Sequence, residues 1–156
     1  MYPALHDDVI PLSFLLGTWR GEGKGSYPTT DAFAYAEEIR FTHPGKAHLR
    51  YDQQSWDAAS GAPLHSEMGF WRPQGSGRVE IVLAYPLGIV DVEEGTVTGG
   101  TIEVASLVTA RTSTAKEVAR IERTFTVEGD LMRYELRMSA VGVPLVYHAD
   151  AELRRV

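Results

Sequence analysis

The chain contains no cysteine. That absence excludes a disulfide-stapled scaffold, a thiolate zinc site, an iron–sulfur cluster and a cysteine nucleophile. The fold must therefore depend on a hydrophobic core, and a reducing cytoplasm is its natural setting. With 156 residues, the chain fits one domain, residues 1–156, and is long enough to bury such a core.

An excess of positive charge and a long apolar run are missing as well. The 15 lysine and arginine residues are outnumbered by 21 aspartate and glutamate residues, which gives a formal net charge of −6. Because nucleic acids are bound by electropositive surfaces, we expect no nucleic-acid partner. No apolar segment approaches the length of a membrane span, and residues 1–8 lack the basic start and apolar run of a signal peptide. These absences predict a cytoplasmic protein without a membrane partner.

The sequence does contain a repeated pattern of short strand-like segments separated by turn residues. Ten segments fit it: 18–27, 33–42, 47–56, 64–72, 78–85, 89–95, 101–109, 117–127, 131–140 and 145–154. The apolar run Val9–Leu16 precedes them and predicts one or two helical turns that plug a barrel end. A long meander of strands favours closure, because closure removes exposed edges. We predict an all-β fold, a single antiparallel up-and-down β-barrel of about ten strands with a short N-terminal helical plug.

The two ends of the chain carry the most informative residues. Gly17–Gly23 (GTWRGEG) opens the first predicted strand, where glycines indicate sharp bends or close backbone approach. We expect Trp19, within that segment, to pack at the base of the barrel. Of the five histidines, His65 and His148 lie within strands and are the two that can point inward. No zinc-type spacing links the histidines.

Other polar and aromatic patterns predict little chemistry. The pairs Glu37–Glu38 and Glu93–Glu94 are adjacent on strands, so the two side chains of each pair face opposite ways and cannot work together. The arginines are spread over predicted outer faces, and none stands out as an inward anchor for a carboxylate. Trp56 and Trp71 flank the turn at residues 57–62 and are predicted to pair across one hairpin. Residue patterns alone predict a barrel with a cavity and leave its occupant open.

Several segments taken together resemble the nitrobindin family. They are Pro11–Gly23, Tyr27–Thr29, Glu37–Phe41, Pro63–Pro73, Ala115–Val118 and Pro144–Leu145 leading to His148. Nitrobindins are ten-stranded antiparallel barrels related in shape to fatty-acid-binding proteins. The likeness covers nearly the whole chain, and the combination of segments is far more specific than the Gly-x-Trp opener.

The resemblance implies one haem b per chain, with His148 as the proximal ligand of the iron. It also implies that the pocket is formed by Thr29, Leu64, His65, Tyr85, Lys116 and Met138, with Lys116 near a propionate. One departure is Ala149, which stands where a leucine is expected. A second is Asp150, which would share a face with His148 on an unbroken strand. We expect either a β-bulge that shifts the phase there, or Asp150 at the wet rim.

For function, the resemblance implies an enzyme, a peroxynitrite isomerase whose ferric haem converts peroxynitrite to nitrate. Nitric oxide is expected to bind the same open axial position. Two alternatives stay open. One is a haem-based sensor of nitric oxide or peroxynitrite without significant turnover, and the other is a haem-free carrier of a small apolar ligand. A homodimer is a further hypothesis that no sequence pattern supports.

Overall fold

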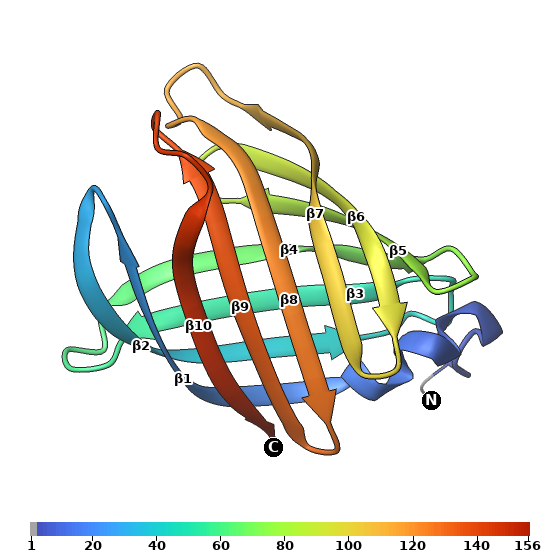
Figure 1. Cartoon of the computed structure of the whole chain (residues 1–156). Helices are drawn as coiled ribbons and strands as arrows, with labels where there is room; N and C mark the ends of the chain where they lie inside the picture. Colours follow the sequence, from blue (N-terminus) through green and yellow to red (C-terminus); the bar gives the residue numbers. More distant parts are fainter. Residues whose placement is uncertain (1–2) are drawn as a thin grey trace.

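The structure, a computed structural model, describes residues 3–156, which form one 3₁₀-helix and ten β-strands (Figure 1). The helix η1 covers Asp7–Leu15, and the strands are β1 (Gly17–Tyr27), β2 (Thr30–Thr42), β3 (Leu49–Asp57), β4 (Pro63–Pro73), β5 (Arg78–Tyr85), β6 (Ile89–Thr98), β7 (Thr101–Arg111), β8 (Val118–Glu128), β9 (Leu131–Ala140) and β10 (Val146–Arg155). They close into an antiparallel barrel in the order β1-β10-β9-β8-β7-β6-β5-β4-β3-β2. The predicted fold class is confirmed.

The up-and-down order divides the connections between the two ends of the barrel. Helix η1 and the connections that follow β2, β4, β6 and β8 lie at one end, which we call the base (Figure 1). The connections that follow β1, β3, β5, β7 and β9 lie at the other end, which we call the mouth. Residues far apart in the sequence therefore meet at the mouth wherever an odd-numbered strand ends or an even-numbered strand begins.

Helix η1 closes the base. Its side chains Val9, Leu12 and Leu15 are fully buried. The indole Nε1 of Trp19 donates a hydrogen bond of 2.8 Å to the carbonyl of Leu15, and the guanidinium of Arg155 lies 4.1 Å from the centre of the Trp19 ring. The predicted plug and the predicted packing of Trp19 are both confirmed.

An aromatic cluster fills the barrel above the plug. The ring of Trp71 lies 5.2 Å from that of Phe41 and 5.4 Å from that of Phe125, both in edge-to-face geometry. The predicted pairing of Trp56 with Trp71 is wrong, since Trp56 pairs with Pro63 and Trp71 pairs with Leu49. Trp56 lies beside the turn at the mouth, whereas Trp71 is near the far end of β4, so a shared hairpin does not bring them together.

The glycines of β1 allow close approach to neighbouring elements, as predicted. A Cβ added at Gly21 would lie 1.9 Å from the carbonyl oxygen of Glu152 on β10. We expect Gly21→Ala to lower the free energy of unfolding by about 2 kcal/mol or more, because β1 and β10 must move apart. Urea denaturation measures the change. Glu22→Ala, at the exposed neighbouring position, is the control and should stay within about 0.5 kcal/mol of the wild type.

Candidate functional site at the barrel mouth

The strand order places every predicted site residue at the mouth. They lie in the β1–β2 turn (Thr29), at the start of β4 (Leu64 and His65), at the end of β5 (Tyr85), in the β7–β8 connection (Lys116), near the end of β9 (Met138) and near the start of β10 (His148). These elements are spread around the whole barrel, and the neighbours among them are β4 and β5, β9 and β10, β1 and β10, and β8 and β9. Closure of the sheet is therefore what assembles the candidate site.

A β-bulge sets the direction of His148. The register between β10 and β9 pairs Tyr147 with Arg137 and Ala149 with Leu136, which leaves His148 as the extra residue. After the bulge, Ala149 and Ala151 are buried inside the barrel, so Asp150 between them faces outward. There its carboxylate accepts a hydrogen bond from the hydroxyl of Tyr147. Of the two expectations for Asp150, the structure shows the bulge.

The ring of His148 is held by its Nδ1, which lies 3.2 Å from the carbonyl oxygen of Ser26 on β1. A carbonyl can only accept, so Nδ1 carries the proton and Nε2 presents a lone pair. The rings of Tyr27 and Phe33 pack around the imidazole at 5.3 and 6.1 Å between ring centres. Burial lowers the pKa of His148, which keeps the ring neutral near neutral pH.

This donor arrangement fits a haem iron. A neutral imidazole, oriented by a backbone carbonyl through one nitrogen and open at the other, is the form in which histidine binds metals. The ring is only partly exposed and sits among aromatic side chains, which suits the apolar face of a porphyrin. His148 therefore has the chemistry expected of a proximal ligand.

The opposite wall of the mouth carries Tyr85 and His65. Strand β5, which ends at Tyr85, is five strands from β10 in either direction around the barrel and so lies across from His148. The His65 and Tyr85 rings are 5.6 Å apart. His65 Nε2 lies 3.1 Å from a carboxylate oxygen of Glu67. His148, the candidate proximal ligand, therefore lies on the wall of the mouth opposite to His65 and Tyr85.

The remaining predicted residues have less defined surroundings. Met138 is partly buried and packs against the core. Leu64 is 48% exposed, and Thr29 and Lys116 are also exposed. Their placement at the mouth is compatible with contacts to the edge of a haem, and their roles stay predictions.

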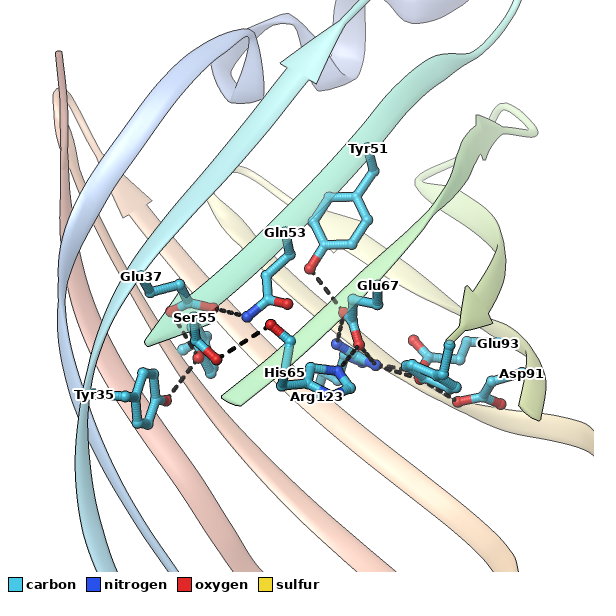
Figure 2. Close-up of polar contacts among 12 residues, drawn as sticks. Tyr35, Glu37, Tyr51, Gln53, Ser55, His65, Glu67, Asp91, Glu93 and Arg123 are labelled. Carbon is cyan, nitrogen blue, oxygen red and sulfur yellow. Dashed lines mark hydrogen bonds and ion pairs between the residues drawn. The ribbon is translucent and has the colours of Figure 1, made fainter. Parts of the chain in front are cut away.

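Below the mouth lies a buried polar cluster that the sequence analysis missed (Figure 2). We call it the ion cluster, and it consists of Glu67, Tyr85, Asp91, Glu93 and Arg123. Its cation, Arg123, was expected on an outer face together with the other arginines. That expectation is wrong for this residue, which is 6% exposed and points into the barrel.

All three nitrogens of the Arg123 guanidinium are engaged. Nη1 and Nη2 donate to the two carboxylate oxygens of Glu67 at 2.6 and 3.2 Å, and Nε donates to Glu93 at 2.9 Å. Nη2 also donates to the Tyr85 hydroxyl at 2.7 Å. Although burial opposes ionisation, Arg123 holds the pKa of Glu67 well below its usual range. Burial raises the pKa of Glu93 to about 8 despite the same arginine.

A second buried carboxyl group, Glu37, lies on β2 and receives two hydrogen bonds. Gln53 donates to one of its oxygens and the Tyr134 hydroxyl to the other, both at 2.8 Å. Burial raises its pKa from the usual 4.5 to about 7, even though both hydrogen bonds favour the charged form. As predicted, Glu37 and Glu38 face opposite ways, since Glu38 pairs with Arg20 and Arg40 on the outside.

The raised pKa values of Glu37 and Glu93 predict a stability that declines with pH. Between about pH 4.5 and the folded values near 7 and 8, the folded chain retains protons that the unfolded chain has released. The free energy of unfolding therefore falls as pH rises through this window. In Glu37→Gln the fall should be smaller by about 1–3 kcal/mol. Urea denaturation at a series of pH values measures both slopes, and equal slopes would contradict the assignment.

A simple signal could have identified both buried groups. Arg123 lies on the same face of β8 as Ile121, Phe125 and Val127, all of which are buried. Glu37 likewise lies on the same face of β2 as the buried residues Tyr35 and Ile39. A charged residue in phase with an apolar strand face is the pattern that predicts a buried, paired charge.

Comparison with known proteins finds a family model and relatives that match nearly the whole chain. The model of the THAP4-like, heme-binding beta-barrel domain matches residues 8–155. Peroxynitrite isomerase 2 of Mycobacterium marinum is 50% identical over 155 residues, covering 97% of this chain and 96% of the relative. The peroxynitrite isomerase of Nocardia farcinica is 46% identical, covering 97% and 93%.

Solved structures agree with the fold. The crystal structure of Rv2717c from M. tuberculosis superposes with a TM-score of 0.94 at 44% identity, covering 98% of this chain and 99% of that chain. An S-type phycobiliprotein lyase, CPES from Guillardia theta, shares the fold at a TM-score of 0.61 and 13% identity, covering 92% and 89%. The described helix, which is short, is not long and apolar enough to cross a membrane.

Proposed function

This chain belongs to the THAP4-like haem-binding β-barrel family, which includes the nitrobindins, and we propose that it isomerises peroxynitrite to nitrate on a ferric haem b held by His148. The observation that carries the proposal is the geometry of His148, whose Nδ1 is committed to the Ser26 carbonyl while Nε2 stays available. Relatives from two bacterial genera that bear the name peroxynitrite isomerase match nearly the full chain.

When bound, the haem would supply a ferric iron at which peroxynitrite could react or nitric oxide could bind. The chain's own residues hold and shape the site. His148 on β10 would hold the iron, and Tyr27 and Phe33 pack against its ring. Met138 contributes an apolar wall. Lys116, at the exposed edge, is placed to pair with a propionate.

Isomerisation of peroxynitrite to nitrate moves one oxygen and needs no external electron donor. The protein's contribution is therefore confinement, because fragments that escape into water do not recombine as nitrate. Apolar side chains at the mouth exclude water from the reacting species. Confinement does not require an arginine that donates hydrogen bonds to the substrate. Arg123 accordingly donates its hydrogen bonds to Glu67, Glu93 and Tyr85.

The test has two stages. Ferric haem is titrated into the purified chain, and the absorption spectrum should show a sharpened Soret band that saturates at one haem per chain. Peroxynitrite decay is then followed by stopped flow, with nitrate and nitrite quantified at the end. Catalytic decay with nitrate as the dominant product supports the proposal. Stoichiometric trapping without turnover would indicate a sensor instead.

The carrier alternative is weakened by the ion cluster. An apolar-ligand carrier that binds a carboxylate needs an inward cation with free donors, and every nitrogen of Arg123 already donates to a protein group. Absence of a specific Soret band in the titration would restore this alternative.

The expected partners are peroxynitrite and nitric oxide. The net charge of −6 disfavours nucleic acid, and a cytoplasmic location without a membrane partner stays a prediction. Homodimerisation is also a prediction, and sedimentation velocity of the haem-loaded chain at several concentrations would test it.

A further inference from the structure

Glu67 determines which nitrogen of His65 carries the proton. Its carboxylate lies 3.1 Å from His65 Nε2 (Figure 2). The carboxylate is 4% exposed, and an ionised carboxylate can only accept hydrogen bonds. Nε2 must therefore be the protonated nitrogen. Within residues 3–156, Nδ1 of His65 has no hydrogen-bond partner, and the side chain is 39% exposed at the mouth.

The position of Glu67 is itself fixed from two other strands. Its Oε1 accepts from the Tyr51 hydroxyl at 2.8 Å and from Arg123 Nη1 at 2.6 Å. Its Oε2 accepts from Arg123 Nη2 and from His65. Because Tyr51 and Arg123 are buried, the carboxylate cannot rotate away from the imidazole without breaking the ion pair with Arg123. The arrangement resembles a catalytic base whose tautomer is set by a buried carboxylate.

We propose, on the premise of the function above, that Glu67 is a positioning residue that keeps the proton of neutral His65 on Nε2, so that Nδ1 accepts the proton of peroxynitrous acid at the mouth. The O–H bond of the acid breaks and an Nδ1–H bond forms, which leaves the peroxynitrite anion and an imidazolium paired with Glu67. The imidazolium then returns the proton to water through its exposed side. No electron is transferred in this step.

Charged and titratable groups face His65 from several strands. They are Glu67 on β4, Tyr85 on β5, Arg123 on β8, Glu37 on β2 and His148 on β10. Glu67 is the one that forms a hydrogen bond to the ring, and Tyr85 contacts it through its own ring. The tautomer therefore depends on Glu67 and is insensitive to a change at Glu37.

Glu67→Gln should reverse the tautomer. Oε1 accepts the shorter hydrogen bonds, from Tyr51 at 2.8 Å and from Arg123 Nη1 at 2.6 Å, whereas the donors at Oε2 lie at 3.1 and 3.2 Å, so the amide oxygen of the glutamine takes the Oε1 position. The amide NH₂ then occupies the Oε2 position and donates to His65 Nε2. His65 must move its proton to Nδ1, and a proton acceptor at the mouth becomes a donor.

The first readout is the ¹⁵N spectrum of the imidazole in the full chain, recorded without haem and in the diamagnetic ferrous carbonyl form. The wild type and the matched control Glu37→Gln should both show neutral His65 protonated at Nε2. Glu67→Gln should show it protonated at Nδ1. An Nε2–H tautomer in Glu67→Gln would overturn the positioning role. Because this readout does not need haem, it stands even where the proposed peroxynitrite chemistry fails.

The second readout is the pH profile of peroxynitrite decay by the haem-loaded chain. Glu67→Gln should react about twofold more slowly at about pH 7, where much of the substrate is protonated, and as fast as the wild type at about pH 9. His65→Leu, at a side chain that is 39% exposed, should show the same profile. A reversed tautomer with an unchanged rate at about pH 7 would overturn proton acceptance by His65.

The two readouts also separate this inference from the proposed function. A wild type that forms no nitrate would refute the proposed function, whatever the tautomer. A wild type that forms nitrate, together with Glu67→Gln and His65→Leu variants whose pH profiles match it, would refute the inference alone.

Discussion

Replacing His148 by alanine should abolish the Soret band of the chain titrated with ferric haem. The Nδ1 of the imidazole lies 3.2 Å from the Ser26 carbonyl oxygen, and this contact orients the ring and leaves Nε2 available for the iron. Loss of an outer-shell partner of a metal ligand already costs about 10- to 100-fold in affinity, so removal of the ligand itself should cost about 100-fold or more. Absorption titration measures the change directly.

Two controls distinguish a lost ligand from a disturbed barrel. Added imidazole should restore the Soret band of His148→Ala, because the free ligand can enter the space left by the ring. His48→Ala, at a histidine in the connection between β2 and β3 at the base, should bind haem as the wild type does. Saturable binding by His148→Ala with an unchanged spectrum would show that another residue holds the iron.

The strands and the plug could be predicted because each depends on local pattern. Turn residues and alternation located all ten strands to within three residues at every boundary, and β5 (Arg78–Tyr85) and β9 (Leu131–Ala140) were predicted without error. The bulge at His148 could be anticipated because Asp150 would otherwise face the interior. In both cases the information lies within a few residues of the feature.

The ion cluster could not be assembled from the sequence in the same way. Glu67, Glu93 and Arg123 lie on three strands, β4, β6 and β8, and interact only because the closed sheet faces them toward one another. Alternation shows that Arg123 shares a face with Phe125, but it does not show which carboxylates approach it. The tautomer of His65 depends on this cluster, so sequence patterns could not predict which nitrogen of His65 carries the proton either.

Replacing Arg123 by methionine should have the largest effect on stability. The substitution leaves Glu67 and Glu93, which are 4% and 0% exposed, without their shared cation. Removing one partner of a buried ion pair typically costs about 3–5 kcal/mol, because the remaining charge is buried and uncompensated. Urea denaturation at about pH 8.5 should show a loss of this size in the free energy of unfolding. Arg120→Met, on the same strand and in an exposed pair with Glu122, should cost less than about 1 kcal/mol.

The pH dependence of the Arg123→Met deficit tests its cause. Without the arginine, burial raises the pKa of both carboxyl groups, so they take up protons as the pH falls and the uncompensated charge disappears. The deficit should therefore shrink by about half or more between about pH 8.5 and about pH 5. Neutralising the carboxylates in Arg123→Met by adding Glu67→Gln and Glu93→Gln should recover part of the loss at the higher pH. A deficit that is equal at both pH values and unaffected by these changes would mean that Arg123 stabilises the barrel by filling space and not by its charge.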